Sequence, residues 1–176
     1  LWVGAFGDTL ISDPTCAKIT GATYNGTAMT QLPTVSPVGT PADRCVYLFY
    51  LIAPATGANN VVVSASSSIV IKGLSASYTG AKQSGVPDAS ANNTATSATS
   101  ITTSVTVVAA NSWTILVGKN SFGAPVAGTG STQRQNANDF GLFDSNGPLA
   151  AGSRSMQITI GTSSNFGVIM ASFAPL

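Results

Sequence analysis

Alternation of apolar and polar residues along the chain predicts an all-β protein. In residues 101–107 and 156–160 one face is built mainly from Ile, Val and Met, and the residues between them are Ser, Thr or Gln. Successive side chains of a strand point to opposite faces, so this period of two is typical of antiparallel strands with one exposed face. No segment keeps apolar residues three and four positions apart over three turns, and we therefore expect no long helix.

Eight further segments have strand character and are separated by turns rich in Gly, Pro and Asn. They are residues 1–6, 19–24, 27–32, 44–53, 59–66, 69–79, 112–119 and 165–173. The clearest turn is Asn25-Gly26, because this pair supplies the positive φ angles of a type I′ hairpin. The stretches 80–100 and 123–138 are expected to be surface loops. The sequence thus predicts one domain over residues 1–176, an antiparallel β-sandwich, jelly-roll-like, of about nine or ten strands.

Residues 44–53 depart from the alternation, because both faces of this segment are apolar. Val46 and Leu48 lie on one face, and Tyr47 and Phe49 lie on the other. A strand of an antiparallel sandwich usually exposes one face to solvent. The second face must therefore be covered by a loop, by another segment of the chain or by another subunit.

Charged residues make up only 7% of the chain, where about 25% is typical of a soluble domain. The acids are all Asp, the bases nearly balance them, and the net charge is +1. Repulsion between copies is therefore weak, which favours association of the chain with itself. The sequence contains no basic run, so we expect no nucleic-acid partner. The longest apolar run, residues 45–53, is too short to predict insertion into a membrane.

The chain lacks the residues that most often carry acid-base chemistry. It contains no His and no Glu, so Ser-His-Asp and Cys-His nucleophile systems are excluded and the commonest metal ligand is absent. No glycine-rich phosphate loop or dinucleotide motif occurs. We therefore expect no enzymatic activity, no catalytic residue and no cofactor.

Cys16 and Cys45 are the only cysteines of the chain. They either form one disulfide, closing a loop of about 30 residues, or remain as two buried thiols in strands. The sequence leaves both alternatives open.

Two groups of residues are candidates for ligand binding. Asp139 and Asp144 lie in a stretch with Asn and Gly that can bind calcium through carboxylates and carbonyls. The alternative for residues 144–148 is a turn in which Asp and Asn side chains cap the backbone. A glycan site needs aromatic platforms at the surface, although both tryptophans also suit a core. The aromatic candidates are Trp2, Tyr24, Tyr78 and Trp113.

A succession of turn and core motifs resembles jelly-roll modules of bacterial secreted proteins and phage virions. The motifs are TYNGTAM (23–29), VYLFYL (46–51), APATG (53–57), SYTG (77–80) and GLFDSNGP (141–148). The resemblance spans most of the chain and implies an extracellular, cell-surface or virion location.

Modules of this kind are expected to have one more strand before the first residue, which this sequence does not contain. A sheet edge beside Leu1, Trp2, Val3 and Phe6 would then accept a strand from a second copy, and these residues would form a subunit interface. The alternative is a plain edge strand at which the given sequence begins.

Two functions fit these observations. The first is a non-enzymatic structural subunit of an extracellular or virion assembly, such as a filament, lattice or shell, whose copies are joined by strand addition. The second is a carbohydrate-binding or adhesin module of a secreted bacterial or phage tail protein. The first predicts copies of the chain as partners, and the second predicts glycans.

Overall fold

The computed structural model describes residues 1–8, 13, 15–33, 36–39 and 44–176, and every regular element in them is a β-strand. The prediction of an all-β, antiparallel protein is confirmed. The first sheet has the order β4 (Thr30–Gln31), β6 (Arg44–Tyr50), β1 (Trp2–Asp8) and β8 (Val70–Ala76), with β5 (Ser36–Val38) also paired to β6. The second has the order β11 (Val126–Ala127), β14 (Gly152–Phe173), β10 (Trp113–Asn120), β13 (Phe140–Asp144) and β12 (Thr132–Ala137), with β9 (Ala89–Val107) paired to β14. The third has the order β3 (Thr27–Ala28), β2 (Ile19–Tyr24) and β7 (Val61–Ala65).

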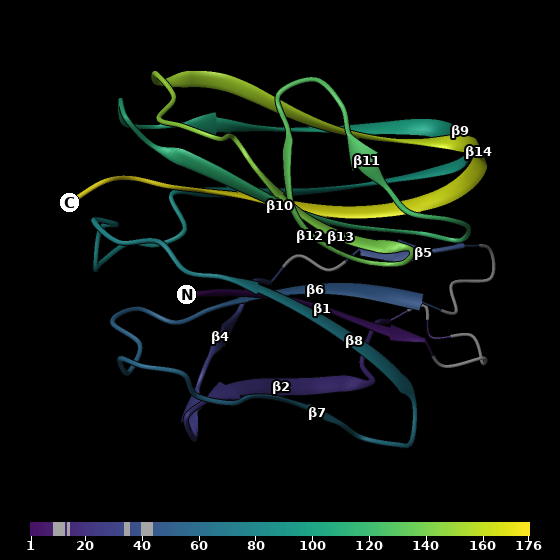
Figure 1. Ribbon diagram of the computed structural model, residues 1–176, viewed down its shortest axis with the longest axis horizontal. Coiled ribbons are helices and arrows are strands. Elements are labelled where there is room, and N and C mark those ends of the chain that lie inside the picture. Colours follow the sequence, from purple (N-terminus) through teal and green to yellow (C-terminus); the bar gives the residue numbers. More distant parts are fainter. Residues whose placement is uncertain (9–12, 14, 34–35, 40–43) are drawn as a thin grey trace.

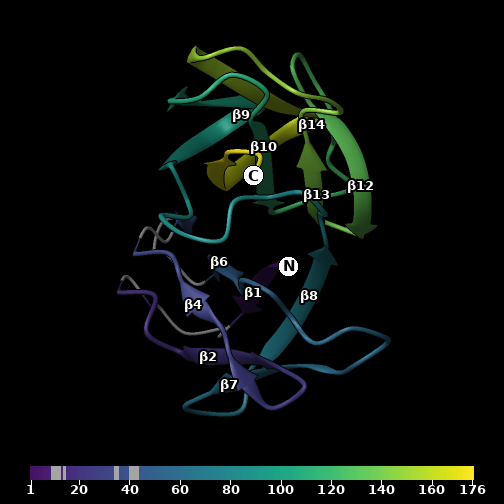
Figure 2. The same cartoon turned by 90° about the vertical axis from the view of Figure 1, so that its left-hand side faces the viewer.

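The sheets are stacked as successive layers (Figure 1). The small third sheet lies at the bottom of the view, and the first sheet lies above it. The strands β10 and β13 form the next layer, and the paired strands β9 and β14 curl over the top. Figure 2 shows the same layers from the end of the molecule that carries both chain termini. The arrangement is sandwich-like, with an additional cover on each side.

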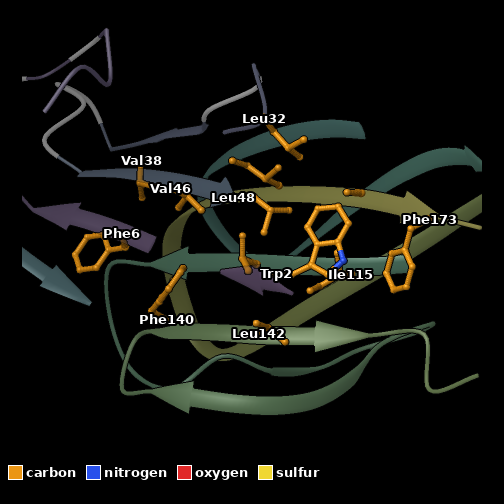
Figure 3. Packing of buried hydrophobic residues seen from close by; sticks show 13 residues of the cluster. Trp2, Phe6, Leu32, Val38, Val46, Leu48, Ile115, Phe140, Leu142 and Phe173 are labelled. Atoms are coloured by element: carbon orange, nitrogen blue, oxygen red, sulfur yellow. The ribbon is translucent and has the colours of Figure 1, made fainter. Parts of the chain in front are cut away.

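The main core lies between the first and second sheets, where side chains of β1 and β6 meet those of β10, β13 and β14 (Figure 3). The ring of Trp2 lies 5.5 Å from that of Tyr50 and 5.5 Å from that of Phe173, measured between centroids. At the other end of β1, the centroids of Phe6 and Phe140 are 6.0 Å apart. Aromatic contacts between the two sheets therefore close both ends of this core.

A second core lies on the opposite face of the second sheet. The second half of β14 pairs with β10, while β9 follows β14 along most of its 22 residues. The register between β14 and β9 shifts after Thr159 and again after Ser164, and such irregularities bend a strand. Leu116 and Phe143 thereby pack in one cluster with Met156 from the curled half of β14.

The third sheet covers the outer face of the first sheet. Tyr47 and Phe49 of β6 pack in one cluster with Ile19 and Ala22 of β2. The two-sided strand predicted within residues 44–53 is therefore covered by another segment of the same chain. This outcome removes one of the arguments for a contact with another subunit.

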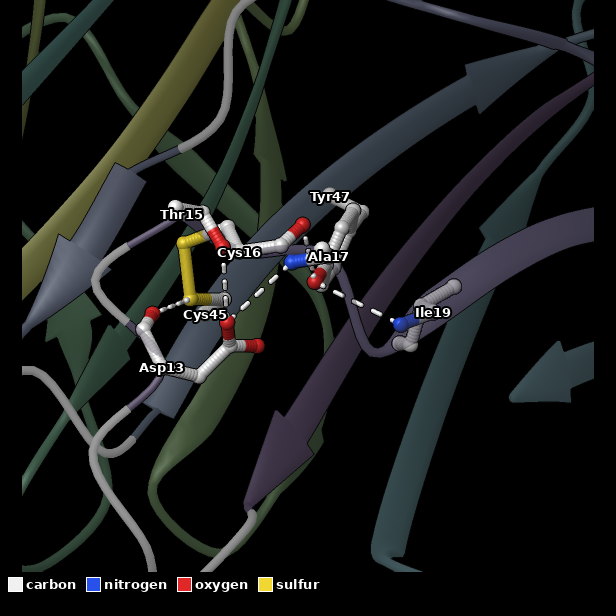
Figure 4. The surroundings of a disulfide bond; sticks show 7 residues. All are labelled: Asp13, Thr15, Cys16, Ala17, Ile19, Cys45 and Tyr47. Atoms are coloured by element: carbon white, nitrogen blue, oxygen red, sulfur yellow. Dashed lines mark hydrogen bonds between the residues drawn. A yellow bond between two sulfur atoms is a disulfide. The ribbon is translucent and has the colours of Figure 1, made fainter. Parts of the chain in front are cut away.

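Cys16 and Cys45 form a disulfide within this third core (Figure 4), with their Cα atoms 5.5 Å apart. The Tyr47 hydroxyl donates a hydrogen bond to the Cys16 carbonyl oxygen at 2.7 Å. The backbone N–H of Ala17 donates to Oδ1 of Asp13 at 3.3 Å. The covalent bond thus joins the segment before β2 to β6, and nearby polar contacts fix that segment.

The predicted open edge beside Leu1, Trp2, Val3 and Phe6 is wrong. β1 lies between β6 and β8, and its residues from Trp2 to Asp8 have a partner on both sides. Trp2, Val3 and Phe6 are at most 4% exposed, and Leu1 is half-buried. The expected interface residues are therefore core residues, because the missing neighbour of β1 is supplied by β8 from later in the chain.

Two stretches expected to be loops contain strands. Residues 89–100 belong to β9 and pair with β14, and residues 132–137 form β12 beside β13. Their Ala, Ser, Asn, Thr and Gln residues have modest β-propensity, but pairing with an apolar neighbouring strand overrides propensity. The described residues accordingly form fourteen strands, several of only two or three residues, where nine or ten were expected for the whole chain. The Asn25-Gly26 hairpin turn is confirmed, since both residues have positive φ angles.

Gly4 marks a close approach of the first and second sheets. A Cβ atom at Gly4 would lie 2.5 Å from Cγ1 of Val117 and 3.3 Å from the ring of Phe140. We expect Gly4→Ala to lower the free energy of unfolding by about 1–3 kcal/mol, as overpacking of a core does. Gly73→Ala is the matched control, because its nearest described neighbour, the Gly4 carbonyl oxygen, is 3.9 Å away. Equal losses for both variants in urea denaturation would contradict this account.

Candidate functional site

Three of the four aromatic candidates line two neighbouring hollows on either side of Tyr78. Tyr24 lies in the larger hollow, Trp113 lies in the smaller one, and Tyr78 borders both. Trp2 is only 4% exposed and belongs to the main core. The alternative of core packing therefore holds for Trp2, whereas Trp113 is half-buried and keeps part of its ring at the surface.

The larger hollow, which we call the Tyr24 cleft, has a volume of about 660 Å³. Its walls are Leu1, Tyr24 at the end of β2, Val61, the turn 54–59 and residues 75–79. The Tyr24 hydroxyl donates a hydrogen bond to the Gly57 carbonyl oxygen at 2.8 Å. The side-chain amide of Asn59 donates to the Thr56 carbonyl oxygen at 3.2 Å. These two bonds hold the turn and the tyrosine ring in fixed positions.

The smaller hollow, which we call the Trp113 hollow, has a volume of about 290 Å³. It is lined by residues 77–81, by Asn111 and Trp113 at the start of β10, and by residues 173–175. The Trp113 and Tyr78 rings are 5.6 Å apart, and the Phe173 ring lies 5.0 Å from that of Tyr78. The Trp113 and Phe173 rings thus both pack against the Tyr78 ring.

Tyr78 is held in place by a buried carboxylate. Its hydroxyl donates a hydrogen bond to Oδ2 of Asp144 at 2.8 Å, and Nε of Arg134 donates to the same oxygen at 2.7 Å. The backbone N–H of Asn146 donates to Oδ1 of Asp144 at 2.8 Å. Burial, followed by the hydrogen bond to Asp144, raises the pKa of Tyr78. The Tyr78 side chain is therefore neutral and fixed in position, and it separates the two hollows.

The side chains that line the two hollows are uncharged. Among the described residues, no Asp, Lys or Arg side chain borders either of them. Their walls offer aromatic faces, hydroxyl groups, backbone carbonyls and the side-chain amides of Asn59 and Asn111. Such groups can stack on an apolar face of a ligand and form hydrogen bonds with its hydroxyls, and they provide no acid-base pair.

The expected calcium pair is not formed. Asp139 directly precedes β13 and Asp144 is its last residue, and each carboxylate is paired with at least one cationic side chain. Nζ of Lys72 and Nζ of Lys119 each lie 2.7 Å from an oxygen of Asp139. The turn interpretation of residues 144–148 holds instead, since Asp144 caps the Asn146 N–H and Asn146 has a φ of 54°. In the described part of the chain no cluster of three potential metal ligands occurs.

The cluster around Lys119 places an ammonium group inside the main core. The Lys119 side chain is 1% exposed, and its Nζ lies 4.7 Å from the centroid of the Phe6 ring. Burial lowers the pKa of Lys119, and the Asp139 carboxylate opposes that shift. Burial alone raises the pKa of Asp139, but hydrogen bonds from Lys119 and Lys72 outweigh it and bring this pKa below its ordinary value. The cluster is a structural ion pair that borders neither hollow.

No family model, curated protein or solved structure matches the chain. The described residues also include no helix of the length and apolarity needed to cross a membrane.

Sequence reasoning identified Tyr24, Tyr78 and Trp113 but missed the two asparagines of the hollows. Asn59 follows a turn that the sequence marked only as a separation between two strands. Asn111 lies two residues before the start of β10. Asn is common in turns for conformational reasons. Nothing in the sequence therefore distinguished these two from the other asparagines of the chain.

Proposed function

We propose that the chain is a non-enzymatic carbohydrate-binding or adhesin module that binds a neutral glycan in the Tyr24 cleft. The observation that carries this proposal is a hollow of about 660 Å³ that has no charged side chain in its described lining and has a tyrosine ring on each of two walls. This volume lies within the range of about 300–1,000 Å³ that is common for small-molecule sites. Fixed aromatic rings and fixed polar groups favour sugars, which present both apolar C–H faces and hydroxyls.

The composition and the disulfide support an extracellular setting for this activity. Disulfides such as Cys16–Cys45 persist mainly in oxidising compartments. The sandwich-like fold is compatible with the jelly-roll modules of secreted bacterial and phage proteins that the motifs resemble. The absence of His and Glu from the sequence supports a binding role without catalysis.

Glycan arrays followed by calorimetry test the proposal with three variants of the purified protein. Tyr24→Ala should weaken binding of a neutral glycan about tenfold or more, because it removes an aromatic platform and a hydrogen bond. Tyr24→Phe keeps the platform and should lose less. Phe122→Ala is the control, since Phe122 is an aromatic residue with 67% exposure that borders neither hollow. Absence of binding to every neutral glycan, or equal loss in the control, would reject the proposal.

A structural role in a filament, lattice or shell is the second candidate, and one observation favours it. β7 and β8 are edge strands of their sheets within the described chain, and a groove of about 370 Å³ lies between them. Val61, Val63, Ile71 and Leu74 line this groove. A strand from a second copy could pair with such an edge, and a net charge of +1 offers little repulsion.

Light scattering and electron microscopy separate the two candidates. Ordered polymers that dissolve when a Lys is introduced at Val62, which is 53% exposed on β7, would support the structural role. A monomer that remains soluble at high concentration would reject it.

A further inference from the structure

The two hollows share one wall. Ser77, Tyr78 and Thr79 border both the Tyr24 cleft and the Trp113 hollow. These residues follow β8, whose last residue is Ala76, so they form a narrow ridge between the two spaces. A ligand that fills the Tyr24 cleft and extends over this ridge enters the Trp113 hollow.

The two hollows also repeat the same set of chemical groups. The Tyr24 cleft has Tyr24 of its own, the Trp113 hollow has Trp113 and Phe173, and each has one asparagine, Asn59 or Asn111. Both share the Tyr78 ring, together with the hydroxyls of Ser77 and Thr79. Similar groups on both sides of a shared wall match a ligand that is itself built from repeated units.

We propose that the Trp113 hollow is a second subsite, and that the ligand is a linear, uncharged oligosaccharide that crosses Tyr78 and occupies both hollows at once. This inference rests on the proposed glycan binding in the Tyr24 cleft. The described lining offers no cationic side chain to an acidic sugar, and a buried or partly buried carboxylate or sulfate requires a cationic or hydrogen-bonded partner, so neutral sugars are favoured. Simultaneous occupation requires several sugar units, so the site recognises the interior of a chain as well as its end.

The ridge is rigid, which suits a site that must align two subsites. The Tyr78 hydroxyl is fixed by Asp144, whose side chain is 2% exposed, and Asp144 is fixed in turn by Arg134. The Tyr78 ring is fixed by contact with Trp113 and Phe173. A ligand that binds such a preformed surface loses little free energy to ordering of the protein.

A series of neutral linear oligosaccharides of two to six units, from the glycan class that binds best on the array, tests this inference. We expect affinity to rise with chain length until both hollows are filled. Trp113→Ala should weaken binding of the longest member about tenfold. It should weaken binding of the disaccharide less, because Trp113 also holds the Tyr78 ring that borders the Tyr24 cleft. Tyr24→Ala should weaken both.

Asn111→Gly provides a second variant in case Trp113→Ala fails to fold. Asn111 is exposed and has a φ of 62°, a conformation that Gly adopts without strain. Loss of the Asn111 side chain should affect only the long ligands, because Asn111 borders only the Trp113 hollow. Tryptophan fluorescence gives an independent readout, because Trp113 is the more exposed of the two tryptophans and should respond to long ligands only.

The outcomes separate the two proposals. If glycans bind in the Tyr24 cleft but affinity does not depend on chain length or on Trp113, the second subsite is refuted and the proposed function stands. If no glycan binds, both fail. If proline-rich peptides bind across Tyr78 in place of sugars, the aromatic surface serves peptide recognition, and both proposals are overturned.

Discussion

Replacement of Asp139 by Asn is expected to lower the free energy of unfolding by about 3 kcal/mol. The change keeps the shape of the side chain but removes the negative charge that lies 2.7 Å from Nζ of Lys119. Lys119 is 1% exposed, so its ammonium group would remain in the core without a counter-charge. The expected loss lies at the low end of the range for buried pairs, because the Asp139 side chain retains 24% exposure. Urea denaturation of the wild type and the variant measures it.

Two further variants show whether the buried charge is the cause. Lys119→Met removes the charge and fills a similar volume, so its effect should stay within about 1–2 kcal/mol of the wild type. Lys72→Met should cost less than about 1 kcal/mol, because the Lys72 side chain is 27% exposed and its pair with Asp139 is screened by solvent. If Asp139→Asn is as stable as Lys72→Met, the buried ion pair does not stabilise the fold in the way described.

The Asp139 carboxylate also predicts how the free energy of unfolding changes at low pH. The pKa of Asp139 is lower in the folded chain than its ordinary value. Its stabilising contribution is therefore complete above the ordinary pKa and is lost as the pH falls towards the folded pKa. The acid limb of the stability curve should consequently be shallower in Asp139→Asn than in the wild type.

Loss of the disulfide is expected to reduce the free energy of unfolding by about 3–4 kcal/mol. The bond links residues separated by 29 positions, and a closed loop of this length restricts the unfolded chain. The double variant Cys16→Ala/Cys45→Ala should melt well below the wild type. A reducing agent should lower the melting temperature of the wild type and leave that of the double variant unchanged.

The mass of the denatured, alkylated protein provides the control for this prediction. Without reductant, neither cysteine of the wild type should react with iodoacetamide, and after reduction both should react. Two labelled cysteines without reductant, together with a melting temperature that reductant does not change, would contradict the prediction.

The sequence predicted the local parts of the fold better than the way in which they pair. The Asn25-Gly26 turn and the alternation in residues 101–107 depend on neighbouring residues, and both appear in the structure. Residues 89–100 could not be recognised as a strand, because their polar small residues are held by pairing with residues of β14 that lie 59 to 83 positions later in the chain. The position of β1 between β6 and β8 also depends on long-range pairing, which the composition of β1 does not encode.

The sequence predicted which types of residue would form the candidate site, but not how they come together. A surface site for neutral sugars requires aromatic rings, and a short list of tyrosines and tryptophans followed from that requirement. Their convergence depends on β2, β8 and β10 ending or beginning near one another. The role of Asp144 was missed for the same reason, since its partners Tyr78 and Arg134 come from separate parts of the sequence.

The central position of β1 also has a consequence for the rate of folding. Asp8 pairs with Arg44 on one side and with Val70 on the other, so the first sheet cannot form until distant segments have been brought together. Chains dominated by such non-local pairings fold in milliseconds to seconds, and their unpaired strands are exposed to aggregation meanwhile. Oxidation of Cys16 and Cys45 before folding is complete would shorten the search that brings β6 to its neighbours. We therefore expect the oxidised chain to refold faster, and with less aggregation, than the reduced one.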